Sequence, residues 1–216
     1  MDEWTNEEFF NPFGPNILRL KINEDIRLKI LDSIYLCINN HEQMVFEELD
    51  SLNNAVKNSI VDGKMGKVSA AQLTGPENII KNTIQRVLCR YGEHFYNIPC
   101  ISSITDVWYV VMKAGDFHML HSHLGSAELS GAIYLEVPDN LPDPQGNINW
   151  ILGGTGGHGK WNLSEGAWGC SPKLGEVFLW PSWLMHMVYP FRSKQERIMI
   201  SFNGQAVQDT RPTEHK

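Results

Sequence analysis

The chain has a deficit of basic residues and no long apolar run. Its 216 residues include 18 Lys and Arg against 25 Asp and Glu, for a net charge of −7. Binding to a nucleic-acid backbone or to an anionic membrane surface requires a basic footprint. We therefore expect neither duplex nucleic acid nor a membrane as a partner. No apolar run reaches the roughly 18–20 residues of a membrane span, and the acidic start MDEWTNEEFF lacks the basic and apolar regions of a signal peptide.

Cysteine is also scarce, and its spacing forms no recognised motif. The four cysteines, Cys37, Cys89, Cys100 and Cys170, are widely spread and form no C-x-x-C pair. This pattern favours a reduced protein and a cytoplasmic location. Apolar residues make up 42% of the chain, which excludes a disordered chain. The length suits one domain over residues 1–216.

The first hundred residues predict mainly helices and carry no recognisable chemistry. After a turn-rich start, the alternation over 17–22 predicts a strand. Apolar residues near a period of 3.6 predict a helix over 24–60, with a break near Asn39 and Asn40. The same period predicts a further helix over 76–97, where Pro76 suits the first turn.

The period of the apolar residues changes to two after about residue 103. Short runs rich in β-branched and aromatic residues predict strands over 108–112, 129–137, 147–152, 176–180 and 197–203. Strands that follow one another without helices between them are typical of an antiparallel sandwich or barrel. The last of these strands is apolar on both faces, so we expect the N-terminal helices to cover one of them.

The predicted fold is therefore α+β: a double-stranded β-helix, the jelly-roll or cupin-like architecture, with N-terminal helices packed on the outer face of one sheet. We expect residues 1–100 to form the mainly helical part, 101–206 the jelly-roll core and 207–216 a tail. Trp108, Trp180 and Trp183 predict an aromatic rim at the mouth of the barrel.

Three histidines have the spacing of a metal site. On a strand, His121 and His123 would project from the same face, about 6.6–7 Å apart. His186 follows the predicted strand over 176–180, so a jelly-roll can bring it to the same place. Three protein ligands leave positions open for a substrate or O2. An incidental H-x-H pair stays the alternative. His118 lies an odd number of positions from His121, so we expect it to face away, as a polar rim residue.

Arg197 provides a second candidate group. It shares one strand face with Met199, Ser201 and Asn203 by period two. A buried arginine requires a carboxylate partner, which it binds in a bidentate manner. A metal at one end and Arg197 with Ser201 at the other would suit a short dicarboxylate. The alternatives are an internal pair with Glu196 or Glu128, or an exposed Arg197.

These residues lie in two motifs that resemble a known family. The first is His121-Ser122-His123-Leu124-Gly125-Ser126 with Leu129-Ser130-Gly131-Ala132-Ile133-Tyr134-Leu135. The second runs from Gly175 through Pro190, including Trp180-Pro181-Ser182-Trp183-Leu184-Met185-His186, and continues as Glu196-Arg197-Ile198-Met199-Ile200-Ser201-Phe202-Asn203. Together they resemble a family of small 2-oxoglutarate/Fe(II)-dependent oxygenases that is frequent in phage and marine bacterial sequences. The resemblance covers roughly residues 100–205.

The resemblance implies a cofactor set and a role for each residue. His121 and His186 would bind Fe(II), and Arg197 would hold the distal carboxylate of 2-oxoglutarate, helped by Ser201 and Tyr134. The enzyme would use O2 to hydroxylate a protein or small-molecule substrate, with release of succinate and CO2. A phage-encoded member would work in the host cytoplasm.

The motif departs from the broader superfamily at one position. The superfamily has H-x-D or H-x-E, where this chain has His123. We expect His123 to complete a three-histidine metal site. Otherwise Glu128 would supply a carboxylate, or the position would stay without a protein ligand.

Three other interpretations compete with the oxygenase. A cupin-type metal protein would use Glu128 as a ligand, and a structural jelly-roll would bind no metal. Gly154 to Lys160 matches the nucleotide-binding pattern G-x-x-x-x-G-K, but Trp161 replaces its Ser or Thr. We expect the glycine-rich stretch 153–169 to be a loop over the barrel mouth, where Lys160, Trp161 and Trp168 would contact substrate.

Overall fold

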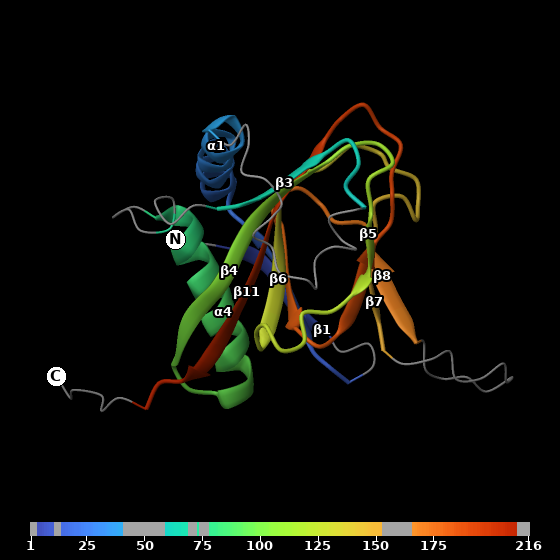
Figure 1. Ribbon diagram of the computed structural model, residues 1–216. Helices are drawn as coiled ribbons and strands as arrows, with labels where there is room; N and C mark the ends of the chain where they lie inside the picture. Colours follow the sequence, from blue (N-terminus) through green and yellow to red (C-terminus); the bar gives the residue numbers. More distant parts are fainter. Residues whose placement is uncertain are drawn as a thin grey trace, which may run out of the picture.

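The computed structural model describes residues 4–10, 14–40, 59–68, 73, 78–152 and 166–210. Within these ranges the chain forms two helices that cover one face of a β-sandwich (Figure 1). The predicted α+β architecture is confirmed. The predicted helical continuation beyond Asn40, the loop residues 153–165 and the end of the tail lie outside the described residues.

The two helices correspond to two of the predicted ones. Helix α1 spans Glu24–Asn40 and helix α4 spans Ile79–Tyr96. The side chain of Asn78 accepts a hydrogen bond from the Lys81 backbone at the start of α4, so the helix begins three residues after the predicted first turn at Pro76. At its end, Asn97 is left-handed and its backbone N–H returns to the carbonyl of Glu93.

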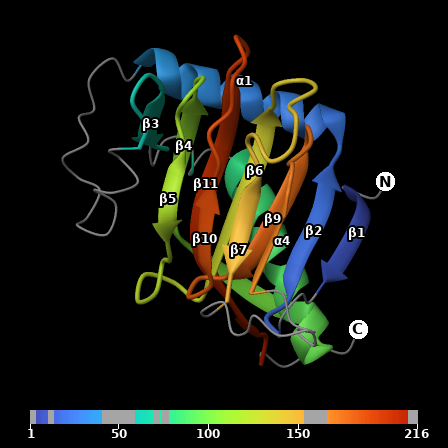
Figure 2. The same ribbon diagram turned by 90° about the vertical axis from the view of Figure 1, so that its right-hand side faces the viewer.

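Two antiparallel sheets form the sandwich. The larger has the order β1-β2-β9-β6-β11-β4-β3, and the smaller has the order β5-β10-β7-β8 (Figure 2). The strands of the larger sheet are β1 Trp4–Phe10, β2 Ile17–Ile22, β3 Lys64–Lys67, β4 Cys100–Met112, β6 Leu129–Glu136, β9 Glu176–Pro181 and β11 Arg197–Gln208. Those of the smaller sheet are β5 His118–His121, β7 Ile148–Ile151, β8 Ala167–Cys170 and β10 Met185–Val188. Every predicted strand is present.

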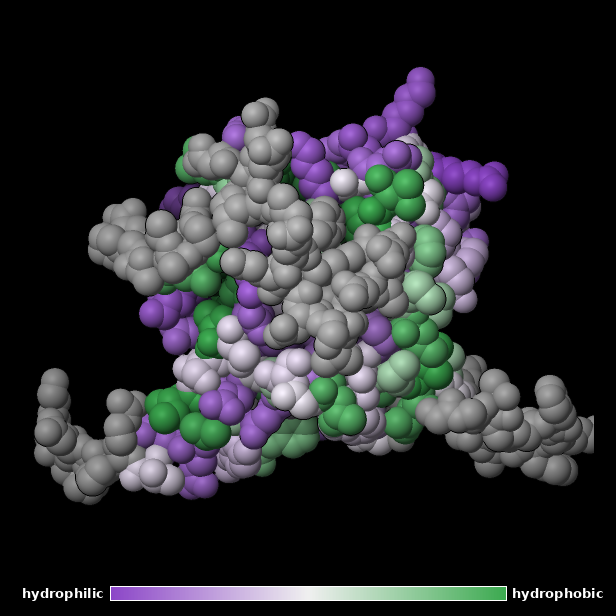
Figure 3. Space-filling view, viewed as in Figure 1, coloured by the Kyte–Doolittle hydropathy of each residue, from purple (hydrophilic) through white to green (hydrophobic). Residues whose placement is uncertain are grey.

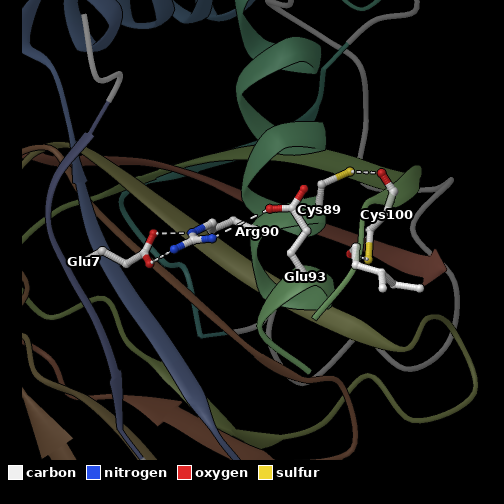
Figure 4. Close-up of polar contacts among 6 residues, drawn as sticks. Glu7, Cys89, Arg90, Glu93 and Cys100 are labelled. Carbon is white, nitrogen blue, oxygen red and sulfur yellow. Dashed lines mark hydrogen bonds and ion pairs between the residues drawn. The ribbon is translucent and has the colours of Figure 1, made fainter. Parts of the chain in front are cut away.

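Strand β1 was not predicted, and contacts with distant residues stabilise it. It pairs with β2 through an irregular register that shifts between Thr5 and Glu8. Its Glu7 carboxylate accepts two hydrogen bonds from Arg90 of α4, at 2.7 and 2.6 Å. Figure 4 shows this pair together with Glu93, whose carboxylate lies 3.7 Å from the same guanidinium. The local sequence of β1 carries no sign of this partner.

The larger sheet separates two hydrophobic cores. On β11, Ile198, Ile200 and Phe202 belong to the core beneath the helices, and Met199 belongs to the core between the sheets. Strand β4 alternates in the same way, with Tyr109 on the helix side. The helices therefore cover the outer face of this sheet, as the sequence predicted.

The surface and the cysteines have the properties expected from the sequence: no long apolar segment and no disulfide bond. On the face shown in Figure 3, hydrophobic residues lie in several small groups among hydrophilic ones. Among the described residues, no helix combines the length and the apolar character needed to cross a lipid bilayer. The four cysteines are free thiols, and that of Cys89 donates a hydrogen bond to the carbonyl of Cys100 (Figure 4).

A buried carboxylate fixes the chain just before β5. Asp116 is 1% exposed. One carboxylate oxygen accepts hydrogen bonds from the backbone N–H groups of Val61 and Asp62, at 2.8 and 3.1 Å, and the other accepts from Lys113 at 2.8 Å. These bonds join the turn that leads into β5 to a segment more than fifty residues away in the sequence.

Replacing Asp116 should test this anchor. Asp116→Ala removes a charged acceptor from three backbone N–H groups, so we expect the free energy of unfolding to fall by about 2–4 kcal/mol. The matched control is Asp25→Ala, which removes an exposed ion pair with Lys29 and should cost less than about 0.5 kcal/mol. Urea denaturation measures both, and equal losses would contradict the anchoring role.

Candidate metal centre

The structure brings His121, His123 and His186 together between the two sheets. His121 ends β5 and pairs directly with His186 on β10. His123 lies beyond the end of β5, where its backbone N–H donates to the carbonyl of Ser182 at 2.8 Å. The ring centroids of His121 and His186 are 4.2 Å apart, and each lies 5.2 Å from that of His123. One nitrogen from each histidine lies within 4.8 Å of the other two.

Hydrogen bonds orient all three rings in the same sense. The Nδ1 atoms of His121 and His186 face the carbonyls of Met119 and Leu184, at 2.6 and 3.0 Å. The Nδ1 atom of His123 faces Oδ1 of Asn203 at 2.9 Å. A carbonyl oxygen only accepts, so each Nδ1 carries the proton and each Nε2 keeps a lone pair. This tautomer is the one that metal-binding histidines require.

The oxygen that orients His123 is itself held in place. Ser130 on β6 donates to Asn203 Oδ1 at 2.8 Å, which fixes the amide with its oxygen toward His123. The Nε2 atom of His123 has no partner among the described residues. Asn203 was not assigned to the site from the sequence, although its place on the same strand face as Ser201 and Arg197 was the available signal.

Burial keeps the three imidazoles neutral at neutral pH. Desolvation lowers the pKa of His123 to about 4, and it lowers the pKa values of His121 and His186 as well. Among the described residues no carboxylate belongs to this cluster, and Glu128, the ligand of the cupin alternative, has an exposed side chain. Three neutral imidazole nitrogens suit iron, cobalt, nickel or zinc.

Arg197 is buried without a carboxylate partner in the described part of the chain. Its side chain is 0% exposed, and its Nη2 donates to the carbonyl of Gly146 at 2.6 Å. Nε and Nη1 have no partner among the described residues. The expectation of an exposed Arg197 is therefore wrong, and among the described residues neither Glu196, which lies 3.6 Å from Lys113, nor the exposed Glu128 pairs with it. Burial lowers the pKa of Arg197, but an arginine stays charged.

Gly146 makes the approach of this guanidinium possible. Its φ is +69°, and a Cβ at this position would lie 2.3 Å from Arg197 Nη2. A residue with a side chain would therefore displace the arginine. This role was missed in the sequence, where Gly146 stands as one loop glycine among many.

A pocket lined by the histidines extends along β11 as far as Met199, two positions from Arg197 on the same strand face. Ser201 and Met199 line it, following Asn203 along the same face of the strand, and Arg197 comes next. The rings of Tyr134 and Phe191 flank the guanidinium, at 5.7 and 5.3 Å from its Cζ. The cavity volume is about 30 Å³, about one water molecule. A five-carbon diacid therefore requires side chains such as the flexible Met199 to move.

The unpartnered polar atoms fit a metal and a dicarboxylate. The three Nε2 lone pairs suit Fe(II), and the buried guanidinium suits a carboxylate. The hydroxyl of Tyr134 is also buried and has no partner among the described residues. Each unsatisfied group costs free energy in the isolated protein, and 2-oxoglutarate beside Fe(II) supplies a partner for each kind.

Two expectations from the sequence are wrong. His118 does not face away: it is 5% exposed, lines the same pocket, and its ring lies 6.1 Å from that of His121. The four residues from His118 to His121 on β5 span three on β10, His186 to Val188, because the register shifts there. This irregularity reverses the alternation. The aromatic rim is also wrong, since Trp108 and Trp180 are buried and only Trp183 of the three is exposed.

Comparison with known families gives a match over the jelly-roll. Residues 106–203 match the model of a family described as "Putative 2OG-Fe(II) oxygenase". The matched segment contains both histidine motifs and Arg197. A comparison with curated proteins gives no match.

Solved structures share the fold at low sequence identity. A prolyl-4-hydroxylase from Pseudomonas putida is 13% identical, with a TM-score of 0.57 over 87% of this chain and 91% of that one. HygX from Streptomyces hygroscopicus, with nickel and 2-oxoglutarate bound, is 10% identical, with a TM-score of 0.58 over 90% and 83%. A viral collagen prolyl hydroxylase from Paramecium Bursaria Chlorella virus-1 is 14% identical, with a TM-score of 0.50 over 93% and 94%. These similarities establish the double-stranded β-helix fold.

The buried histidines should make the stability of the metal-free protein depend on pH. Burial lowers the pKa of His118 to about 3 and that of His123 to about 4, whereas both take up protons near pH 6.5 in the unfolded chain. Below 6.5 the unfolded state therefore binds more protons, and the free energy of unfolding should fall as the pH drops. We expect up to about 1.4 kcal/mol per pH unit for each histidine.

Urea denaturation at pH 6.5 and 5, with a chelator present, measures this effect. His118→Leu removes one titrating group and should make the pH dependence shallower. His94→Leu, outside the cluster, should leave it unchanged. An unfolding free energy that stays constant or increases toward pH 5 would contradict the buried neutral histidines.

Proposed function

We propose that the chain is a 2OG-Fe(II) oxygenase, in which His121, His123 and His186 hold the iron and Arg197 binds the distal carboxylate of 2-oxoglutarate. The observation that carries this assignment is Arg197: a fully buried guanidinium, two of whose nitrogens have no partner in the part of the chain that the structure describes, on the strand face that leads to the histidines. The family match favours this function over the cupin and structural alternatives.

The protein residues would bind the metal and the cosubstrate, orient them and neutralise the charge of the distal carboxylate. Fe(II) and 2-oxoglutarate, when bound, would activate O2 as the oxidant, with one oxygen atom entering succinate, CO2 released and the other oxygen atom available to the substrate. The Nδ1–H bonds of the three histidines hold their Nε2 atoms toward one point. Arg197 offers Nη1 and, on another edge, Nε to acceptor oxygens, and the hydroxyls of Tyr134 and Ser201 lie on the same side of the sheet as donors. The apolar walls exclude water from the reacting groups.

His123 replaces a carboxylate ligand with a neutral one. The metal centre then keeps the full charge of Fe(II), which strengthens its attraction for the anionic cosubstrate. A neutral third ligand also favours the ferrous state. This feature distinguishes the proposed centre from the two-histidine, one-carboxylate arrangement.

Hydroxylation is the proposed outcome of the reaction. Several structural neighbours are prolyl hydroxylases by name, from Pseudomonas putida, a Chlorella virus and Trichoplax adhaerens. Others are named as an epimerase and a carbocyclase, so the shared fold does not fix the outcome. The substrate is a protein side chain or a small molecule. The cytoplasmic location and the phage origin stay predictions.

Arg197 variants test the cosubstrate site. Arg197→Ala should reduce 2-oxoglutarate-dependent succinate formation at least a hundredfold, because a charge-assisted contact between a carboxylate and a buried guanidinium contributes about 3 kcal/mol. Arg197→Lys, which keeps the charge but loses the planar fork, should retain partial activity. Succinate formation and O2 uptake measure the effect. Normal turnover by Arg197→Ala would contradict the assignment.

Histidine variants test the metal centre separately. His186→Ala should lower the affinity for Fe(II) or Co(II) at least tenfold, whereas Glu128→Ala should leave it unchanged, because Glu128 is exposed and outside the cluster. His123→Asp supplies the carboxylate of the superfamily and should retain metal binding, unlike His123→Ala. Equilibrium titration under anaerobic conditions measures each affinity. Loss of metal binding in Glu128→Ala would favour the cupin alternative instead.

A further inference from the structure

A fourth histidine lines the pocket, and the metal centre does not use it. His118 is 5% exposed, and its Nε2 atom has no partner among the described residues. It is not part of the group of three nitrogens that lie within reach of one metal ion. A buried imidazole nitrogen without a partner costs about 1–3 kcal/mol. A structural role does not explain that cost, since an apolar side chain would avoid it.

The position of His118 lies on the Arg197 side of the histidine cluster. On β10, His186 is opposite His121, and Val188 is opposite His118. The chain then continues through Tyr189 and Pro190 to Phe191, whose ring lies 5.3 Å from the Arg197 Cζ. Val188 therefore lies nearer to the guanidinium than His186 does, and so does His118, which pairs with Val188.

Electrostatics agree with this placement. The positive charge of Arg197 contributes to the lowered pKa of His118, along with desolvation and His121. The causes of the lowered pKa values of His121, His123 and His186 do not include Arg197. Of the four histidines, His118 is therefore the one that lies within electrostatic reach of both the cluster and Arg197.

We propose that His118 is a binding residue for 2-oxoglutarate: its Nε2–H donates a hydrogen bond to a carboxylate oxygen of the cosubstrate, between the metal centre and Arg197. The bond satisfies the orphaned nitrogen and adds a donor to the charge contact of Arg197. A hydrogen bond to a charged group contributes enough for a roughly tenfold or greater change in affinity. This inference rests on the proposed function.

The test separates metal binding from cosubstrate binding. Wild-type protein, His118→Leu and His118→Gln are loaded with Co(II) without O2, and 2-oxoglutarate is titrated by calorimetry. We expect His118→Leu to raise the dissociation constant of 2-oxoglutarate about tenfold or more. His118→Gln keeps an N–H donor and should stay within about threefold of wild type. The control His94→Gln changes a histidine on α4 that stacks on Phe9 and should bind like wild type.

Two further measurements exclude a merely structural or metal-binding role. The affinity of His118→Leu for Co(II) should equal that of wild type, and its midpoint of thermal unfolding at neutral pH should be equal or higher, because the unpartnered nitrogen is gone. Wild-type affinity for 2-oxoglutarate in His118→Leu would overturn the proposal, as would a loss of Co(II) binding. If wild-type protein binds Co(II) but no 2-oxoglutarate, the proposed function itself fails.

Discussion

Burial of both faces of the larger sheet is the constraint on which the rest of the structure depends. From Arg197 to Gly204 every residue of β11 is buried and has to suit either the core beneath the helices or the interior of the sandwich. Apolar side chains fill the helix face without interruption. On the other face, Arg197, Ser201 and Asn203 alternate with them, and each of these polar groups requires a partner there. Asn203 finds its partners in His123 and Ser130, while two nitrogens of Arg197 find none among the described residues.

The orientation of the three histidines follows from the same need. Two backbone carbonyls and one amide oxygen each accept from an Nδ1 atom, so the rings are held before any metal arrives. Such preorganisation lowers the entropy cost of binding. The geometry of the metal centre also depends on the β-sandwich itself, because the carbonyls of Met119 and Leu184 belong to the same segments that carry the ligands.

Much of this arrangement could be predicted from the sequence, and the limits have physical causes. Period-two alternation was enough to predict the fold, the covered sheet and the face that Arg197 shares with Ser201. The distant His186 could be placed because strand and turn lengths fix where the chain returns. Strand β1 could not be predicted, since its stability comes from Arg90 of α4 rather than from its own residues. The burial of Trp108 and Trp180 could not be predicted either. It depends on how the two sheets pack against each other, and the sequence predicts the strands but not this packing.

The irregular register between β5 and β10 has a consequence for how this site tolerates change in chain length. One additional residue in β5 lets His118 and His121 point into the same pocket. Deleting either Met119 or Leu120 would place the two histidines two positions apart, where regular pairing keeps both imidazoles on the same face. Both residues are about half exposed, so their side chains are free to vary. What the site requires is the match between their number and the pairing: regular pairing at the present length would turn one of the two imidazoles away from the pocket.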